Sequence, residues 1–553
     1  MRRNRIGISI IAIFLLMVCL TGCQKTKEEQ EAIATDQNAA EEIEEMVVAV
    51  NVDSSENVLP FESVLLNRSK FWGSLIFQGL LVADDNINNV KTDLCEEYTI
   101  LPDGKTYVFT LADGLYWHDG EKLTTEDVVF SIETCLRSQE VNGYMKKGIE
   151  EILGSDLFES GEMDSVVGIM VDGNNITIKT SNRNDRFLGT IAQLPILPKH
   201  CLEDVPIEEL GTCDFWKMPI GSGPYKVISN KGNKEAVLVL NDKYSKVLPK
   251  IKQIRYKVLE NPETDYFDFA ITSNPDVIRD FQSRYDYTTI KTGNLYYRYL
   301  YFNLDGRSGE NKDLLKNKRV RQALAMAIDR ESIIHDLYRD AATPMESGIP
   351  AYDDWYDGER NTDVSYNPKI AKSILESEGF DFSKTLVLTR YNQDDLSVKL
   401  LEAIAKSWNA IGVKTDIQPI APNETNKLWV DADWYDVGLK NLAAVDYSEW
   451  YYEYSSHNTM WSVVLHDRPV FDVLISALDG TRWAYERKML YEEIQEMEAE
   501  QMFKIPLAIV PQHIIYNSSN LKIPNITFPN LYYYYDLKLT QWELVDYKAN
   551  GIF

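Results

Sequence analysis

Residues 117–133 read WHDGEKLTTEDVVFSIE, a stretch that combines one histidine with several acidic side chains. Asp119-Gly120 is a dipeptide typical of a tight turn. Thr124 is a favourable helix N-cap, and Asp127 falls in the following first turn, where the helix dipole favours an acid. Turn and cap roles therefore explain the acids without any reaction, and we expect the lone His118 to be structural rather than catalytic.

The same stretch closely resembles the signature of the family 5 extracellular solute-binding proteins, the receptors of bacterial peptide and nickel ABC importers. Thr125 stands where that signature usually has alanine. Three further motifs follow in the order typical of the family: GSGPYKV at 221–227, RVRQALAMAIDRESII at 319–334 and YNPKIAKSILESEGF at 366–380. Together the motifs make the resemblance specific, and it extends from about Val47 to the C-terminus.

The resemblance implies an α/β fold with two lobes, the periplasmic-binding-protein-like type II (cluster C) fold, which encloses a ligand between the lobes. It also implies an extra subdomain in the first lobe. On this chain it places lobe I at 46–71, 190–294 and 504–553, the extra subdomain at 72–189 and lobe II at 295–503. The hinge candidates are 299–305 and 504–510. These boundaries place residues 117–133 away from the cleft.

Hydrophobic patterns, taken without the resemblance, also indicate an α/β chain. MVVAV at 46–50 is typical of a buried strand, and 221–244 of a hairpin that turns around Gly232. Apolar side chains at helical spacing along 317–337 predict one amphipathic helix. LYWH at 115–118 predicts a short strand.

Length and charge narrow the class of protein further. The chain has 553 residues, of which 44% are hydrophobic, so it can bury more than one ordinary core. Its formal net charge of −28 argues against a nucleic-acid partner, because phosphates would be repelled.

The N-terminus has the features of a secretory lipoprotein signal. Three arginines precede a mostly apolar run at 6–20, which is shorter than the roughly 20 residues of a spanning helix. The run ends in LTGC, which resembles the bacterial lipobox and implies a signal peptide at 1–22 and diacylglycerol (palmitate-type) lipidation of Cys23. The polar, acidic segment 23–45 predicts a flexible tether, and a helical stalk is the alternative, since Ala and Glu favour helix. We expect a protein anchored at the outer face of the cell membrane, the alternative being an uncleaved anchor helix.

Four cysteines remain beyond the predicted anchor. They are Cys95, Cys135, Cys201 and Cys213. Export permits oxidation, and four cysteines allow three pairings. Cys201 and Cys213 are close enough in sequence to bridge a loop, and isolated thiols are the other possibility.

The segment NLAAVDYSEWYYEYSS at 441–456 carries the ligand-binding prediction. It resembles the A-D-Y-x-(E/D)-P region of the peptide receptors, in which an aspartate takes the ammonium group of the peptide. Asp446 is the matching residue, although Trp450 stands where the family usually has proline. Tyr447, Trp450, Tyr451 and Tyr452 are candidate pocket-lining aromatics, since they combine apolar area with a polar group, and we expect some of them to lie in the core. Asn303 and Tyr297, near the hinge, are weaker candidates for ligand contact.

Motifs of enzymes are missing from the sequence. It has no G-x-x-x-x-G-K-[ST] nucleotide loop, and its six histidines show no H-E-x-x-H or comparable metal spacing. We therefore expect neither catalysis nor a resident cofactor or metal. The resemblance implies a monomeric receptor that binds oligopeptides or similar amine-bearing solutes and works with ABC permease and ATPase subunits. The alternatives are a nickel-chelate or oligosaccharide receptor, a receptor that senses peptides, and a secreted hydrolase with paired carboxylates.

Overall fold

The computed structural model describes residues 45–545 except for short gaps. The gaps are 53–58, 66–70, 86, 88, 139–140, 142, 185, 233, 262–263, 305–313, 359–363, 422–423, 463, 466–468, 482, 525–527 and 529. The chain divides into two units, 1–45 and 46–553. The predicted signal peptide, Cys23 and nearly all of the predicted tether lie outside the described residues.

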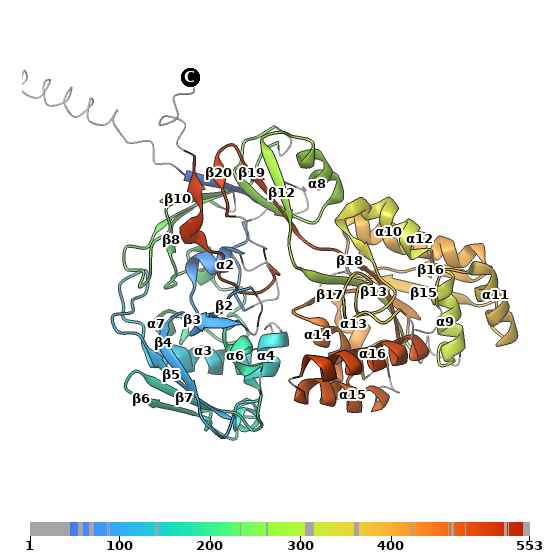
Figure 1. The fold of residues 1–553 in the computed structure, drawn as a ribbon, viewed down its shortest axis with the longest axis horizontal. Coiled ribbons are helices and arrows are strands. Elements are labelled where there is room, and N and C mark those ends of the chain that lie inside the picture. The colour runs from blue at the N-terminus through green and yellow to red at the C-terminus, as the bar shows by residue number, and fades with distance from the viewer. Residues whose placement is uncertain are drawn as a thin grey trace, which may run out of the picture. The chain divides into compact units, whose positions relative to one another are not determined.

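A seven-stranded sheet organises the first part of the fold, in the order β12-β19-β11-β1-β10-β9-β8. Four of its strands, β8, β10, β12 and β19, are labelled in Figure 1. Its strands are β1 (Glu45–Ala49), β8 (Tyr225–Asn230), β9 (Glu235–Leu240), β10 (Gln253–Lys257), β11 (Phe269–Thr272), β12 (Tyr287–Lys291) and β19 (His513–Asn517). β1 runs parallel to β11, with Val48 opposite Phe269. β8 and β9 form the predicted antiparallel hairpin, and Gly232 adopts a φ of 57° in its turn, which a residue without Cβ tolerates.

A six-stranded sheet organises the second part, in the order β14-β18-β13-β17-β15-β16. Its strands are β13 (Leu295–Phe302), β14 (Thr343–Pro344), β15 (Thr385–Arg390), β16 (Lys414–Ile417), β17 (Val437–Ala444) and β18 (Lys504–Ile509). β15 pairs in parallel with β16 and β17, and β13 pairs antiparallel with β17 and β18. The predicted hinge segment at 504–510 therefore contains a strand of this second sheet.

A four-stranded antiparallel sheet, β4-β5-β7-β6, lies within the segment predicted as the extra subdomain. Its strands are β4 (Cys95–Ile100), β5 (Thr106–Leu111), β6 (Ile169–Asp172) and β7 (Asn175–Lys179). Two short pairs complete the described strands: β2 (Leu81–Ala83) with β3 (Val90–Thr92), and β20 (Leu521–Lys522) with β21 (Glu543–Leu544).

Helices connect the strands of all three larger sheets. They are α2 (Phe71–Ile76), α3 (Thr125–Arg137), α4 (Gly143–Ile149), α5 (Ser155–Glu159), α6 (Phe187–Ile191), α7 (Lys199–Leu202), α8 (Pro275–Gln282), α9 (Lys318–Met326), α10 (Arg330–Tyr338), α11 (Pro368–Ser377), α12 (Asp395–Ala410), α13 (Asn426–Trp429), α14 (Tyr447–Tyr452), α15 (Pro469–Gly480) and α16 (Ala484–Gln501). Within the described part of the chain, no helix is both long and apolar enough to cross a bilayer.

Two large hydrophobic cores follow the division between the sheets. The second core, which belongs to the second part of the fold, gathers buried side chains from 297–510 around the six-stranded sheet. The other combines residues of the seven-stranded and four-stranded sheets, between Met46 and Trp542. Each core therefore buries apolar side chains of strands and helices together, which supplies the main stabilisation of each part.

Two local predictions are wrong. The single helix expected along 317–337 is interrupted, because Asp329 caps a new helix, α10, by accepting a hydrogen bond from the Ser332 N–H at 3.1 Å. The strand expected at 115–118 is instead part of a turn region. Among the described residues, its only β-pairing is an isolated bridge between Tyr116 and Lys122. The capping box of Thr124 and Asp127 at the start of α3 is confirmed.

His118 joins two of the signature motifs through hydrogen bonds. Its backbone N–H donates to the Gly221 carbonyl at 2.8 Å, and its Nδ1 accepts from the Gly221 N–H at 3.1 Å. Its Nε2 lies 3.2 Å from the carbonyl oxygen of Gly223. The ring thus fastens the turn of the WHDG motif to the GSGPY turn, which confirms the structural role expected for this histidine.

Candidate functional site

A cavity of about 610 Å³ lies between elements that belong to the two different cores. Segments 141–151 and 183–190, which include α4 and the approach to α6, line one side. The other side is lined by Lys440 and Leu442 of β17, by side chains between 448 and 460, and by Asp479 of α15. A smaller cavity of about 330 Å³ is lined only by residues 74–249 and 534–540, so it stays within one core.

Asp446 is held rigidly beside this cavity. As the N-cap of α14, its Oδ1 accepts a hydrogen bond from the Glu449 N–H at 3.2 Å and another from the Ser448 hydroxyl. Its Oδ2 lies 3.7 Å from Nη2 of Arg186, a residue that lines the opposite side. Burial acts to raise the pKa of Asp446, but the Arg186 charge and the Ser448 hydrogen bond outweigh it, so the pKa is lowered and the group is a carboxylate.

Arg186 carries unused hydrogen-bonding capacity. Its Nη1 lies 3.8 Å from Asp479, and its Nη2 has no hydrogen-bond partner among the described residues. The separation of 3.7 Å from Asp446 exceeds a hydrogen-bond length. A guanidinium of this kind can accept a further carboxylate or carbonyl group, since it presents five donors in a planar fork.

The remaining charges of the cavity are distributed between its two sides. Lys147 of α4 lies with its Nζ 3.5 Å from the ring centroid of Tyr452, and 3.9 Å from Asp479. Glu449 accepts hydrogen bonds from the Val445 N–H at 2.7 Å and the Tyr533 hydroxyl at 3.1 Å. Burial, aided by the neighbouring Asp446, raises the pKa of Glu449 to about 7.

Glu453 lines the cavity and is bonded to buried residues of the second core. It forms ion pairs with Lys440 at 2.9 Å and with the fully buried Lys504 at 3.1 Å. It also accepts a hydrogen bond from the Tyr299 hydroxyl at 2.7 Å. Burial lowers the pKa of Lys504 to about 8. Because each charge here has a partner, we interpret this network as support for the cavity wall.

Three of the predicted ligand-binding residues pack in the second core. Trp450 is fully buried, donates from its indole N–H to Glu498 at 2.7 Å, and packs against Tyr297 with ring centroids 4.5 Å apart. Tyr297 donates its hydroxyl to the Gly348 carbonyl at 2.7 Å. Asn303 donates to the carbonyl oxygens of Ala432 and Tyr435. The polar groups of all three side chains are hydrogen-bonded within the protein, and the side chains are buried. A direct contact with ligand by these residues therefore stays a prediction.

Tyr447 is half-buried, and its hydroxyl donates to Asp353 at 2.7 Å. The aromatic residue of this segment that does line the cavity is Tyr452. Sequence reasoning did not single out Arg186, Lys147 or Glu449. They are ordinary charged residues in an acidic chain, and Arg186 lies 260 positions from Asp446, so only the fold brings them together.

Comparison with known proteins identifies the family. The model of the bacterial extracellular solute-binding proteins, family 5, matches residues 89–466, and the chain belongs to this family. A Brucella ovis protein, whose name includes ABC transporter peptide-binding protein, is 26% identical over 359 residues, which are 62% of this chain and 62% of that protein. The oligopeptide-binding protein AppA of Bacillus subtilis is 26% identical over 454 residues, or 75% of this chain and 77% of AppA.

Solved structures confirm the two-lobed α/β fold. AppA from Bacillus subtilis in complex with a nonapeptide matches with a TM-score of 0.72 and 20% identity, over 91% of this chain and 99% of AppA. NikZ from Campylobacter jejuni in complex with Ni(L-His) matches with a TM-score of 0.67 and 22% identity, over 90% of this chain and 99% of NikZ. These proteins are all named as binding proteins or solved with a bound ligand.

Proposed function

We propose that the protein is the substrate-binding lipoprotein of an ABC importer, and that it binds oligopeptides or similar amine-bearing solutes between its two lobes. The observation that carries this proposal is the ionised Asp446 facing Arg186 beside the cavity, 3.7 Å apart. A ligand with both an ammonium and a carboxylate can pair with each of these charges. Charge-assisted hydrogen bonds of this kind are strong where water is excluded.

Binding would favour closure of the lobes, because one ligand contacts residues of both. In this mechanism the ammonium group of the ligand donates hydrogen bonds to Oδ2 of Asp446, the oxygen that faces Arg186. Arg186 then donates hydrogen bonds to a carboxylate or carbonyl group of the ligand. Lys147 and Tyr452, which line opposite sides of the cavity, already make a cation–π contact between those sides. No bond of the ligand is made or broken.

The proposed domain organisation follows the prediction at 46–71, 72–189, 190–294 and 295–503, with one adjustment. β18 pairs with β13 in the second sheet, whereas β19 pairs with β11 in the first. We therefore place the last crossing between the lobes after Ile509 rather than before Lys504.

The lipid anchor belongs to the same proposal. Cys23 would be acylated, and the segment at 23–45 would tether the receptor to the outer face of the cell membrane beside its permease and ATPase subunits. A single anchor and a short tether keep a monomeric receptor at high effective concentration near its permease.

Thermal unfolding of the purified protein with a peptide library tests the ligand class. We expect peptides with a free N-terminus to raise the melting temperature and their N-acetylated forms to do so far less. Asp446→Asn should weaken binding of the free peptides by about 1.5–3 kcal/mol, since a hydrogen bond to a charged group is lost. Asp381→Asn, an exposed site outside the cavity, is the matched control. Equal responses to peptides, sugars and metal chelates would contradict the proposal.

A nickel chelate is the second candidate ligand, because a histidine lies at the cavity. His457 lines it, with its Nδ1 3.3 Å from the Ser455 hydroxyl, and NikZ is a structural relative solved with Ni(L-His). If this candidate is correct, Ni²⁺ with histidine should stabilise the protein against unfolding more than any peptide does. His457→Ala should then abolish that stabilisation and leave the response to peptides unchanged.

A further inference from the structure

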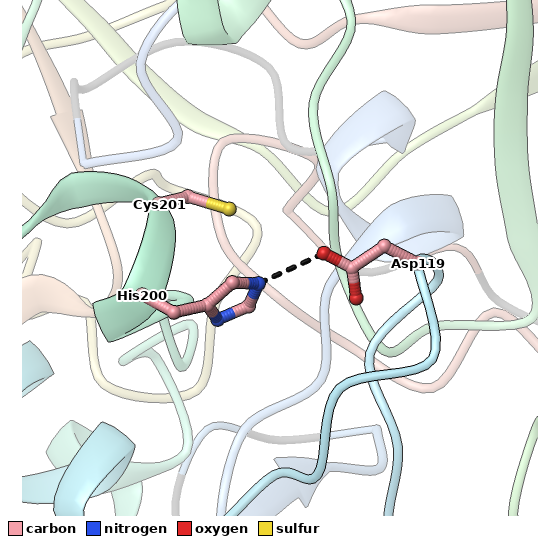
Figure 2. Close-up of side chains that lie close together, drawn as sticks. All are labelled: Asp119, His200 and Cys201. Carbon is pink, nitrogen blue, oxygen red and sulfur yellow. Dashed lines mark hydrogen bonds and ion pairs between the residues drawn. The ribbon is translucent and has the colours of Figure 1, made fainter.

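Three side chains with metal-binding atoms converge in the first part of the fold, at residues that do not line the ligand cavity (Figure 2). Asp119 comes from the turn of the WHDG motif, and His200 and Cys201 are neighbours on α7. Their carboxylate, imidazole and thiol atoms all lie within 4.8 Å of one another. Nε2 of His200 lies 2.8 Å from Oδ2 of Asp119.

The backbone that carries these side chains is firmly held. The Glu121 N–H donates to Oδ1 of Asp119 at 3.1 Å, which leaves Oδ2 directed towards His200. The Lys199 N–H at the start of α7 donates to Oδ1 of Asp127 at 3.0 Å, so the capping residue of α3 also fixes the position of α7. The cluster is therefore preorganised by the signature motif, which lowers the cost of bringing its members together.

The hydrogen bond between Asp119 and His200 explains the placement of those two side chains, but it does not explain the thiol beside them. Cys201 is a half-exposed free thiol in the structure. The other half-exposed cysteine, Cys213, is also free, and its thiol donates to the Leu210 carbonyl at 3.4 Å. Side-chain exposures of 34% for His200 and 31% for Asp119 leave the cluster open to ions from solvent.

We propose that Asp119, His200 and Cys201 form a binding site for a divalent transition-metal ion of the Zn²⁺ type. Thiolate, imidazole and carboxylate are the three ligand types of zinc in proteins, and sites with three protein ligands hold water at the fourth position. On binding, the Cys201 thiol releases its proton to solvent and the thiolate donates an electron pair to the ion. Zinc bonds are about 2.0–2.3 Å long, so the three side chains close inwards around the ion through small rotations.

A metal ion bound at this site would change the stability of the folded protein rather than its solute transport. The ion would link α7 to the turn of the WHDG motif and so stabilise the folded state by mass action, as any ligand specific for the native protein does. Because its residues differ from those that line the cavity, we expect peptide affinity to be the same with and without bound metal.

Titration of the chelator-treated full-length protein with Zn²⁺ and with Co²⁺ tests the proposal. We expect one zinc per chain, a rise in melting temperature on zinc addition, and a thiolate-to-cobalt charge-transfer band in the near-ultraviolet spectrum. His200→Asn and Cys201→Ser should each weaken zinc binding by more than about tenfold, and Cys201→Ser should remove the charge-transfer band.

Two matched variants distinguish this site from metal binding elsewhere on the chain. Cys213→Ser removes a comparable thiol, and His335→Ala removes an exposed histidine that belongs to neither site. Both variants should bind zinc and cobalt as the unaltered protein does. Circular dichroism without metal establishes that each variant folds. The proposal is overturned if the unaltered protein takes up no zinc, or if His200→Asn and Cys201→Ser retain its affinity and spectrum.

Discussion

At His118, both ring nitrogens are engaged by the backbone of residues 221–223. Burial lowers the pKa of this histidine to about 4, well below its ordinary value of 6.5. The unfolded chain therefore gains a proton as the pH falls through 6.5, whereas the folded chain remains neutral until about pH 4. The contribution of His118 to stability is present above pH 6.5 and is lost progressively below it.

Replacing His118 by alanine should leave the Gly221 N–H and the Gly223 carbonyl without these partners. We expect a loss of about 1–3 kcal/mol in the free energy of unfolding at pH 7.5, with peptide affinity unchanged. The loss should shrink towards pH 5, because the unaltered protein is itself destabilised there. Urea unfolding at both pH values measures the effect, with the exposed His335→Ala as control. A loss that is the same at both values would contradict the pKa argument.

Glu449 shows the opposite behaviour, because its pKa is raised from 4.5 to about 7 by burial and by Asp446. The protonated form is favoured in the folded state, so folding stability falls as the pH rises from 4.5 to 7. Glu449→Gln keeps an acceptor for the Val445 N–H and removes the charge.

We expect Glu449→Gln to raise the free energy of unfolding by roughly 1 kcal/mol or more at pH 8. The gain should vanish near pH 4.5, where the carboxyl is protonated in the folded state and partly so in the unfolded state. Chemical unfolding across this pH range measures the difference between variant and unaltered protein. A gain that does not depend on pH would show that packing, rather than ionisation, is responsible.

At the scale of elements, the GSGPY turn depends on the close approach of its backbone to α2. The Gly223 N–H donates to the carbonyl oxygen of Ile76, the last residue of α2, at 2.8 Å. A Cβ added at Gly221 would lie 1.9 Å from that same carbonyl oxygen. The glycines of this motif therefore serve packing between a turn and a helix end.

Gly221→Ala should force α2 and the turn apart, and we expect it to lower the free energy of unfolding by about 1–3 kcal/mol. Gly480→Ala is the matched control, since nothing lies within 4 Å of a Cβ there. Thermal unfolding of the two variants side by side measures the contrast. Equal stability of both would contradict the close approach of Gly221 to Ile76.

The interruption between α9 and α10 shows what hydrophobic periodicity leaves undetermined at this scale. Apolar residues continue at helical spacing through Val320, Leu324 and Ile328, so periodicity alone predicts one helix. Asp329 ends that helix by capping the next one. The capping residue was present in the sequence, but the apolar pattern runs on across it, because both helices bury apolar residues in the second core.

At the scale of the whole molecule, the proposed lipid anchor would hold the protein at the membrane through the acylated Cys23. Cys23→Ser should abolish incorporation of labelled palmitate in producing cells and release the protein from the membrane fraction. Cys19→Ser, inside the predicted signal peptide, is the control and should leave labelling unchanged. Labelling that persists in Cys23→Ser would contradict the lipobox, and the uncleaved anchor helix would then be the better interpretation.

Family, fold class and local turn and cap chemistry could be predicted from contiguous residues. Motifs such as WHDG and GSGPY encode tight turns and helix starts, whose physics depends on neighbours in the chain. The prediction that Asp446 binds ligand rests on the same kind of local motif, and it stays a prediction.

The composition of the cavity and of the cluster of Asp119, His200 and Cys201 depends instead on segments far apart in the chain. Trp450 and Tyr297 are residue types that often line ligand pockets. In this fold they are buried and hydrogen-bonded to Glu498 and Gly348, so they pack in the hydrophobic core. Arg186 looks like a solvated surface charge, yet the fold sets it opposite Asp446. Burial and charge pairing are properties of packed neighbours, and those neighbours are chosen by how sheets and helices come together rather than by any single stretch of sequence.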